Sequence, residues 1–318
     1  MQSEEVAVIE TVNRVYRAQV PARVGLLGNP SDGFKGKTLS LLIKNFCATV
    51  ELLVHNDPAD NTIEIVPHAR FDRFNYNGCC TFTYLIIYSH NHSLTQFTTG
   101  IDDLVTNISV HGYYGGIRLL QATVKTFGKL CNRVGIVLNK ATGFKLTYDT
   151  TIPRMVGLSG SSAIIIATMR VLMKYYNLTI KDLDVTKEQF PQLILDIEKN
   201  ELDIAAGLQD RVIQSYGGLV FMDFSNPPSS SSVLDMMNDH IYCRTELALG
   251  IYKSLNPALL PCLYLAYNTS FGGDSGKVHS TVKSRWQKND PELLEGLYPN
   301  LYPNLIPPNL HSLLINCY

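Results

Sequence analysis

The pattern of apolar and polar residues predicts several β-strands separated by turns. Residues 62–66 alternate between polar and apolar side chains, as a half-buried strand does. Residues 23–28 form a short apolar run that ends in a turn rich in Asn, Pro and Gly, and residues 39–53 are apolar with β-branched interruptions. Two later apolar runs predict further strands at 218–224 and 259–267.

Helical spacing of apolar residues predicts helices in the middle of the chain. In the first of these segments Ile117, Leu120, Val124 and Phe127 recur on one face, and we interpret this stripe as part of a hydrophobic core. The segments expected to be helical are residues 117–127, 164–176, 190–206 and, near the end of the chain, 280–287.

The composition excludes several classes of protein. Of the 318 residues, 45% are hydrophobic and 17% are charged, and the net charge is −1. Because a nucleic-acid-binding protein carries a basic excess or stripe, we expect no nucleic-acid partner. Apolar runs are shorter than a membrane span, and residues 1–5 lack the apolar stretch of a signal peptide. We therefore expect a cytoplasmic protein that has no membrane partner.

Cysteines and histidines do not point to a metal centre. The seven cysteines are irregularly spaced and include no Cys-x-x-Cys pair, so zinc and thioredoxin-type sites have no support and reduced thiols are expected. His90 and His92 would share one face of a strand, but no third ligand lies near them in the sequence.

Residues 157–163 read Gly-Leu-Ser-Gly-Ser-Ser-Ala and lie between a β-rich stretch, 144–148, and the predicted helix at 164. The first N–H groups of a helix have no partner within it, and the helix dipole favours an anion there. Glycines allow close approach of the backbone, and the hydroxyls of Ser161 and Ser162 can contact a phosphate or a metal that bridges phosphates. We interpret the segment as a phosphate-binding loop; the alternative is a serine N-cap and tight turn without a ligand.

Two better-known phosphate loops do not fit this chain. A P-loop needs Gly, four residues and then Gly-Lys-Ser/Thr; residues 36–38 supply the end, but Ser31 occupies the position of the first glycine. The dinucleotide fingerprint Gly-x-Gly-x-x-Gly is also absent from 157–163. The loop therefore belongs to another class of phosphate binder.

Several polar residues suit the transfer of a phosphoryl group. Arg23 offers a cation, and Asp210, in the segment Gly-Leu-Gln-Asp-Arg, offers a carboxylate for a hydroxyl. Glu198 and Glu201 lie three residues apart on one face of a predicted helix and offer a carboxylate for a metal. Phosphoryl transfer needs a positioned acceptor, charge neutralisation by Mg²⁺ and a group directed at the attacking oxygen. Any one of these carboxylates alone is more often a solvated surface residue.

The order of these segments resembles the GHMP kinase superfamily, which includes galactokinase, homoserine kinase and mevalonate kinase. Residues 21–30 loosely match its first motif, Pro-Gly-Arg/Lys-Val-x-Leu-x-Gly-Glu-His. Pro153 and residues 157–163 match its second, Pro-x-x-x-Gly-Leu-Gly-Ser-Ser-Ala, with one residue displaced. Residues 207–211 are similar to Gly-Ile-Met-Asp-Gln of galactokinases. Within the superfamily, four segments resemble those of glucuronokinases: residues 32–40, 112–116, 206–212 and 274–280.

The resemblance implies catalytic and substrate-binding roles for three residues. Asp210 would orient or deprotonate the sugar hydroxyl, Arg23 would stabilise charge on the nucleophile and the transferring phosphoryl group, and Asp32 would contact the sugar. The implied reaction is the ATP-dependent phosphorylation of the anomeric hydroxyl of D-glucuronate to glucuronate 1-phosphate. Lys35 and Lys37 beside Asp32 offer cations for the carboxylate of a uronic acid, or are simply solvated.

The resemblance also implies the cofactors ATP and Mg²⁺. Ser162 and Glu201 would hold the metal, with Glu198 as the substitute for Glu201. The residues that would bind the nucleotide phosphates are Gly157, Leu158, Ser159, Gly160, Ser161, Ser162 and Ala163.

The implied fold is α+β, the two-domain GHMP kinase fold, with a ribosomal protein S5 domain 2-like N-terminal domain and an incomplete ferredoxin-like C-terminal domain. We expect these domains at residues 1–225 and 226–297, followed by an irregular tail at 298–318 that carries a Pro-Asn-Leu repeat. The family's third motif, a glycine-rich loop, is missing after residue 276. These departures predict a truncated or alternatively spliced product with little activity.

Two alternatives to a glucuronate kinase stay open from the sequence. One is a non-catalytic product that binds a ligand or a partner weakly. The other is a kinase of the same family that acts on galactose, fucose or a heptose. In either kinase reading the partner is a small sugar or uronic acid, and the sequence names no protein partner.

Overall fold

The computed structural model describes residues 8–12, 14–34, 36–57, 60–68, 105, 117–138, 143–225, 250–267 and parts of 281–290. Several features of the sequence lie outside these residues, and their predictions are not addressed by the structure. They are Lys35, the histidines at 90 and 92, the segments 112–116 and 274–280, and the tail at 298–318.

The described strands form one seven-stranded sheet in which β3 is the central element. β2 runs antiparallel along one edge of β3. The other edge is shared, because β5 pairs with residues 48–54 of β3 and β6 pairs with residues 37–41. The strands are β1 (Val8–Val12), β2 (Val15–Leu27), β3 (Lys37–Val54), β4 (Ile63–Ile65), β5 (Phe144–Thr150), β6 (Leu219–Asp223) and β7 (Ile251–Leu255).

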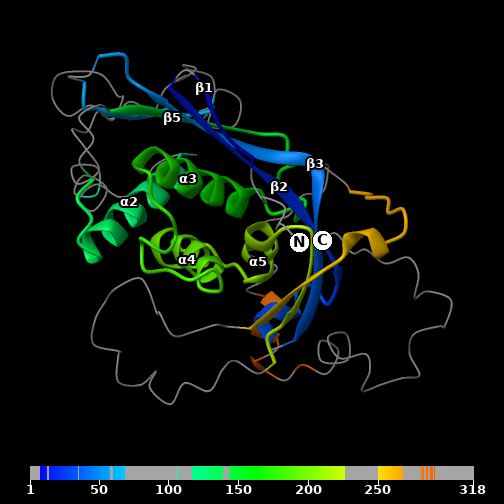
Figure 1. Ribbon diagram of the computed structural model, residues 1–318. Helices are drawn as coiled ribbons and strands as arrows, with labels where there is room; N and C mark the ends of the chain where they lie inside the picture. Colours follow the sequence, from blue (N-terminus) through cyan, green and yellow to red (C-terminus); the bar gives the residue numbers. More distant parts are fainter. Residues whose placement is uncertain are drawn as a thin grey trace, which may run out of the picture.

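The helices lie together on one side of this sheet (Figure 1). The longest, α3, packs against β2, β3 and α2. Because α3 is covered from several directions, most of its residues are buried, including the apolar run Ile164, Ile165 and Ile166. The helical elements are α2 (Arg118–Arg133), α3 (Gly160–Tyr176), α4 (Phe190–Asp196), α5 (Gln209–Tyr216), the π-helical turn η2 (Ile197–Glu201) and the 3₁₀ turns η1 (Ser31–Phe34) and η3 (Pro257–Leu259).

Two hydrophobic clusters stabilise this arrangement. The larger lies between the sheet and α2, α3 and α4, and contains fully buried side chains such as Phe127, Phe144 and Met169. The smaller lies where α5 packs near β6, and includes Val212 and Met222. Asp210 lies on α5, so the packing of α5 in this second cluster positions that residue relative to the sheet.

Most of the predicted strands and helices are confirmed. The runs at 39–53, 62–66 and 218–224 correspond to β3, β4 and β6, and residues 23–28 belong to the end of the longer β2. The helix predicted at 164–176 is α3, which begins four residues earlier at Gly160. The prediction of an α+β fold is confirmed, whereas the division into two domains stays a prediction.

Two element predictions need correction. The helix expected at 190–206 begins at Phe190 as predicted, but it is α-helical only to Asp196, continues as the π turn η2 to Glu201 and then gives way to irregular backbone before Gly207. The strand expected at 259–267 is a 3₁₀ turn followed by irregular chain, in which Leu259 is 81% and Tyr264 89% exposed. Pro261 interrupts that run and has no N–H to donate to a neighbouring strand.

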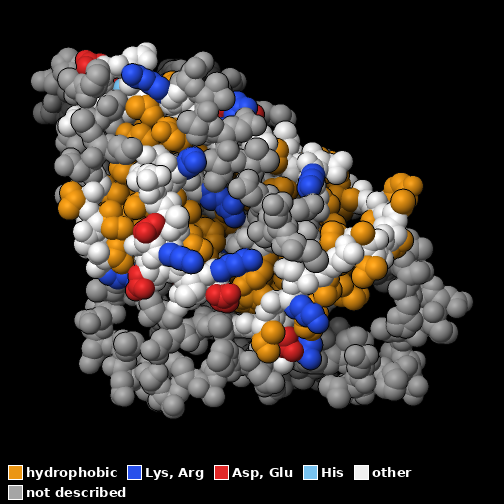
Figure 2. All heavy atoms as spheres, viewed as in Figure 1, with side chains coloured by type: hydrophobic (Ala, Val, Ile, Leu, Met, Phe, Trp, Pro, Cys, Tyr) orange, Lys and Arg blue, Asp and Glu red, His pale blue; other side chains and the backbone are white. Residues whose placement is uncertain are grey.

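None of the helices in the described part of the chain has the length and apolar character to cross a membrane. On the face shown in Figure 2, Lys and Arg side chains are interspersed with hydrophobic and acidic ones and do not form one continuous stripe. The expectation that the chain binds no nucleic acid stays a prediction.

Candidate active site

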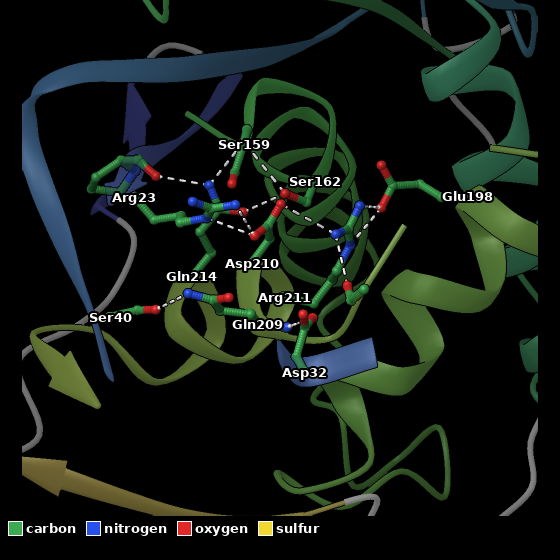
Figure 3. A network of polar contacts seen from close by, with 12 residues as sticks. Arg23, Asp32, Ser40, Ser159, Ser162, Glu198, Gln209, Asp210, Arg211 and Gln214 are labelled. Carbon is green, nitrogen blue, oxygen red and sulfur yellow. Dashed lines mark hydrogen bonds and ion pairs between the residues drawn. The ribbon is translucent and has the colours of Figure 1, made fainter. Parts of the chain in front are cut away.

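An ion pair between β2 and α5 forms the centre of the candidate site (Figure 3). Arg23 lies in β2, and Asp210 is the second residue of α5. Arg23 Nε donates to Asp210 Oδ1 at 2.6 Å, and Arg23 Nη2 lies 2.5 Å from the same oxygen. The Arg23 side chain is 9% exposed and that of Asp210 is 19% exposed, so part of the Asp210 side chain stays accessible. The fold thus brings together the two residues that the sequence assigned to catalysis.

The surroundings of Asp210 keep its carboxyl group ionised. Burial by itself would raise the pKa of Asp210, but the guanidinium groups of Arg23 and Arg211 outweigh this effect and hold the pKa below its usual value. An ionised carboxylate can accept a hydrogen bond from a substrate hydroxyl and so direct the hydroxyl oxygen. Because its basicity is lowered, Asp210 is better suited to orient that hydroxyl than to remove its proton early.

A second, fully buried ion pair lies next to the first. Arg211 Nε donates to Glu198 Oε2 at 2.6 Å, and Nη2 of the same guanidinium contacts the same oxygen. Arg211 Nη1 donates to the carbonyl of Gly207 at 2.8 Å and lies 3.3 Å from Asp210 Oδ2. Figure 3 shows Arg211 between the two carboxylates. Arg23, Asp210, Arg211 and Glu198 therefore form a row of alternating charge whose sum is zero.

The predicted phosphate loop leads directly into α3. Gly157 has φ of 73° and Ser159 has φ of 63°, so the chain turns twice through left-handed conformations before the helix begins at Gly160. No side chain caps the start of α3. The carbonyl of Leu158 accepts a hydrogen bond from the backbone N–H of Arg23 at 3.3 Å, which connects the loop to β2. An uncapped helix start beside an arginine is suited to bind an anion.

The hydroxyl of Ser162 is turned into the protein. Ser162 is fully buried, and its Oγ donates to Gln214 Oε1 at 2.6 Å. Ala163, which follows, is also fully buried, whereas Gly160 and Ser161 are half-buried. The accessible part of the loop therefore includes Ser161 and the backbone around it, and not the Ser162 side chain.

Asp32, the predicted sugar ligand, lies at the start of α5. Its Oδ2 accepts a hydrogen bond from the backbone N–H of Gln209 at 3.0 Å. A Cβ atom at Gly207 would overlap that carboxylate, so glycine is required for Asp32 to approach the helix so closely. Because Gln209 precedes Asp210, the carboxylates of Asp32 and Asp210 are anchored at adjacent positions of α5.

The lysine expected to recognise a uronic acid has a partner in the protein. Lys37 Nζ lies 3.1 Å from Asp223 Oδ2, across the β3–β6 pair. Its side chain is nevertheless 59% exposed, and an exposed ion pair of this kind is weak. The pairing does not prevent Lys37 from contacting a ligand, and its role stays a prediction.

The two glutamates proposed for the metal have different surroundings. Both oxygens of Glu201 are occupied, by Lys125 Nζ at 2.7 Å and Lys129 Nζ at 3.3 Å. Glu198 Oε1, in contrast, is buried and has no hydrogen-bond partner among the described residues. In the part of the chain that the structure describes, no group of three or more His, Cys, Asp or Glu side chains could hold a metal ion. Mg²⁺ often takes only one or two carboxylates and completes its shell with phosphates and water. Glu198, whose Oε1 is not used in a hydrogen bond to a described residue, fits the role of such a single carboxylate ligand.

Sequence reasoning missed the polar residues that connect these parts. Gln214, Gln209 and Arg211 all come from α5. Gln214 and Gln209 bond to segments far away in the sequence, and Arg211 bonds to Glu198, 13 residues before it. One signal was present: Gln214 is four residues after Asp210 and so lies on the same helical face. The hydrogen-bond partners of these three side chains could not be inferred from the sequence, because no local rule specifies which distant group a buried polar side chain contacts.

Comparison with known families identifies the segment that carries the loop and α5. The family model described as the GHMP kinases N terminal domain matches residues 119–218. Residues 119–218 therefore resemble the GHMP kinase N-terminal domain. The matched range includes the loop, Glu198 and Asp210, whereas Arg23 and Asp32 lie before it. The resemblance to the GHMP kinase superfamily predicted from the motifs is confirmed.

Two curated relatives extend this result over most of the chain. The chain is 41% identical over 276 residues to Glucuronokinase 1 of Arabidopsis thaliana, an alignment that covers 87% of this chain and 63% of the relative. It is 40% identical over 286 residues to Probable glucuronokinase 2 of the same plant, covering 90% and 65%. The chain therefore spans just under two thirds of the length of these relatives.

A solved structure supports the fold. A protein from Listeria innocua is 13% identical and superimposes with a TM-score of 0.52 over 90% of this chain and 69% of its own. At that identity the likeness concerns the fold alone.

Proposed function

We propose that this chain is an ATP-dependent sugar kinase that phosphorylates the anomeric hydroxyl of D-glucuronate and releases ADP. The observation that carries the proposal is the partly exposed, ionised Asp210, held by Arg23 next to an uncapped helix start. This arrangement offers an acceptor for a hydroxyl, a cation and an anion site within one small region. The two plant glucuronokinases support glucuronate as the substrate.

In the proposed reaction Asp210 accepts a hydrogen bond from the sugar hydroxyl and directs its oxygen at the γ-phosphorus. A bond forms between that oxygen and phosphorus, and the bond from phosphorus to the bridging oxygen of ADP breaks. The hydroxyl proton passes to Asp210 or to solvent as negative charge leaves the attacking oxygen. Arg23 stabilises charge on the attacking oxygen and on the phosphoryl group, as phosphoryl transfer requires.

The phosphates of ATP would lie at the start of α3, where Gly160 and Ser161 are only half-buried. Glu198 fits Mg²⁺, because its Oε1 has no hydrogen-bond partner among the described residues. Ser162 would contribute only the lone pairs of its hydroxyl oxygen, since that hydroxyl is buried and donates to Gln214. The metal would neutralise charge on the phosphates. Glu201 fits this role less well, because both of its oxygens bind lysines of α2.

Asp32 would bind the sugar ring beside Asp210. Its Oδ2 holds the start of α5, and a carboxylate at this position can accept a hydrogen bond from a sugar hydroxyl. The exposed ammonium of Lys37 is the described cation nearest in sequence to Asp32 that could receive the carboxylate of a uronic acid.

A coupled assay of ADP release over a panel of sugars tests this function. The panel contains D-glucuronate, galactose, fucose and a heptose, with ATP and Mg²⁺ present. We expect ADP release that depends on glucuronate and exceeds the release with each neutral sugar. In Asp210→Asn the rate should fall by about 10²–10⁴, because the group that directs the acceptor is lost.

Three results would change the assignment. Faster turnover of galactose than of glucuronate would move the substrate to a neutral hexose. Tight binding of Mg·ATP and glucuronate without turnover would favour a binding role for this chain. A rate in Asp210→Asn within a few-fold of the wild type would assign the catalytic role to another residue.

A further inference from the structure

The amide of Gln214 connects three separate parts of the candidate site. Its Nε2 donates to the carbonyl of Pro21 at 3.0 Å and to the carbonyl of Ser159 at 3.0 Å. Its Oε1 accepts from Ser162 Oγ at 2.6 Å, and the residue is fully buried. Both N–H groups and the oxygen of one side chain are therefore used, each on a different residue.

These contacts lie beside the proposed chemistry. Gln214 is one helical turn after Asp210 on α5, and Pro21 is two residues before Arg23 on β2. Ser159 and Ser162 belong to the phosphate loop and the first turn of α3. One buried amide thus fixes the loop relative to both members of the catalytic ion pair.

We propose that Gln214 is a positioning residue that holds the phosphate loop in place relative to Asp210 and Arg23. The proposal rests on the kinase function described above. Ser159 has a left-handed backbone, a conformation that is unfavourable for a residue with a side chain. The bond from Gln214 to its carbonyl stabilises that turn, which sets the direction of the N–H groups that follow it. Without this bond the anion site at the start of α3 loses its geometry.

The same contacts fix the direction of the Ser162 proton. Both N–H groups of Gln214 point at carbonyls, so its oxygen must face Ser162 and can only accept. The second neighbour of Ser162 Oγ, the Ser159 carbonyl at 3.3 Å, is also an acceptor. Ser162 therefore offers only oxygen lone pairs to other groups. It can face a cation, but it has no proton to donate to a phosphate oxygen.

The substitution Gln214→Met tests the proposal, because methionine has a similar length and forms none of these hydrogen bonds. The matched control is Gln192→Met. Gln192 Nε2 donates to Asp196 Oδ1 at 2.6 Å within α4, so that bond connects no separate segments. The measurements are the affinity for Mg·ATP and for the sugar by calorimetry, together with kcat and KM.

In Gln214→Met we expect Mg·ATP binding to weaken about tenfold or more. This loss of affinity corresponds to the net free-energy contribution of about one to two hydrogen bonds. Sugar affinity should stay within about twofold, because the Asp32 contacts are unchanged. Gln192→Met should leave both affinities within about twofold. If Gln214→Met does not fold, Gln214→Asn, which keeps the amide on a shorter chain, should show the same selective loss.

Equal Mg·ATP affinity in the wild type and in Gln214→Met would overturn the proposal. So would a parallel loss of nucleotide and sugar affinity, because that pattern indicates general loosening of the fold. Absence of Mg·ATP binding by the wild-type chain would reject the kinase function itself, and the positioning role with it. The wild-type measurement therefore separates the two failures.

Discussion

Four side chains at the candidate site form a row in which positive and negative charges alternate. Arg23, Asp210, Arg211 and Glu198 each have an opposite charge within about one hydrogen-bond length, and three of them are almost completely buried. Burying charges is unfavourable unless they are paired, so the row is tolerated only as a neutral unit. Removal of any one member leaves a buried charge without its full complement.

The lowered pKa of Asp210 predicts how its ion pair responds to pH. The folded-state value lies below the usual 3.8, so the stabilisation by Asp210 is complete above that pH and is lost as the pH falls through the folded-state value. The difference in melting temperature between the wild type and Asp210→Asn should stay constant from about pH 7 to pH 5 and shrink only in stronger acid. Thermal unfolding of both proteins over this range measures it. A difference that shrinks between pH 7 and pH 5 would contradict the lowered pKa.

The two glutamates provide a matched test of the metal site. Glu198→Gln and Glu201→Gln each remove a buried carboxylate that faces cations, so both should lower the free energy of unfolding, by roughly 3–5 kcal/mol where the pair is fully buried. Only Glu198→Gln should remove the part of ATP affinity that depends on Mg²⁺. The readout is calorimetric binding of ATP with Mg²⁺ and with a chelator in its place. If Glu201→Gln alone abolished the Mg²⁺ effect, the assignment would return to Glu201.

At the residue scale, the sequence motifs were enough to select candidate catalytic residues, but only the fold shows which side chains those residues contact. Arg23 and Asp210 could be selected from the sequence, because each lies in a segment with a family pattern. The choice between Glu198 and Glu201 could not be made from their spacing. It depends on which glutamate meets Arg211 and which meets the lysines of α2, and these contacts span 13 and more than 70 residues.

Among the elements, the start of α5 organises the site. Its first residues meet η1 through Asp32, β3 through Ser40 and β2 through Arg23. Gln209 Nε2 donates to Ser40 Oγ at 2.6 Å, which attaches the helix to the central strand. A short helix with so many partners keeps its orientation although it is only eight residues long.

Gly207 allows this close approach, and its substitution is the prediction for this scale. In Gly207→Ala the new Cβ would overlap the Asp32 carboxylate, so Asp32 must move and its bond to Gln209 must lengthen. We expect sugar affinity to fall about tenfold or more, together with a lower melting temperature. Gly33→Ala is the control beside Asp32, because a Cβ there has nothing within 4 Å. Equal effects of the two substitutions would contradict a specific role for Gly207.

The elements also mark the limit of sequence patterns. Strands with clear apolar runs, such as β3 and β6, were predicted because burial on a sheet requires that pattern. The helix predicted at 190–206 fails after Asp196, since the chain there changes to a π turn. This turn directs Glu198 toward Arg211, and hydrophobic periodicity carries no signal for it.

At the scale of the whole molecule, β3 connects the two hydrophobic clusters. Of its 18 residues, 39–43 and 47–53 pair with β2, while β5 pairs near one end and β6 near the other. Leu52 belongs to the larger cluster beside α3, whereas Thr38 pairs with Met222 of the smaller one. Because both clusters share β3, disruption of either cluster should destabilise the other.

We therefore predict one cooperative unfolding transition for both clusters. Leu52→Ala and Met222→Ala truncate fully buried side chains, and each should lower the free energy of unfolding by about 2–5 kcal/mol. Leu53→Ala, next to Leu52 on β3 and 44% exposed, should change it by about 1 kcal/mol or less.

Denaturant unfolding followed by circular dichroism and by intrinsic fluorescence measures the transition. Coincident curves with an unchanged slope are expected, because β3 cannot leave one cluster without weakening the other. In Met222→Ala, a separate early transition that leaves most of the circular dichroism signal unchanged would show that β3 does not couple the two clusters.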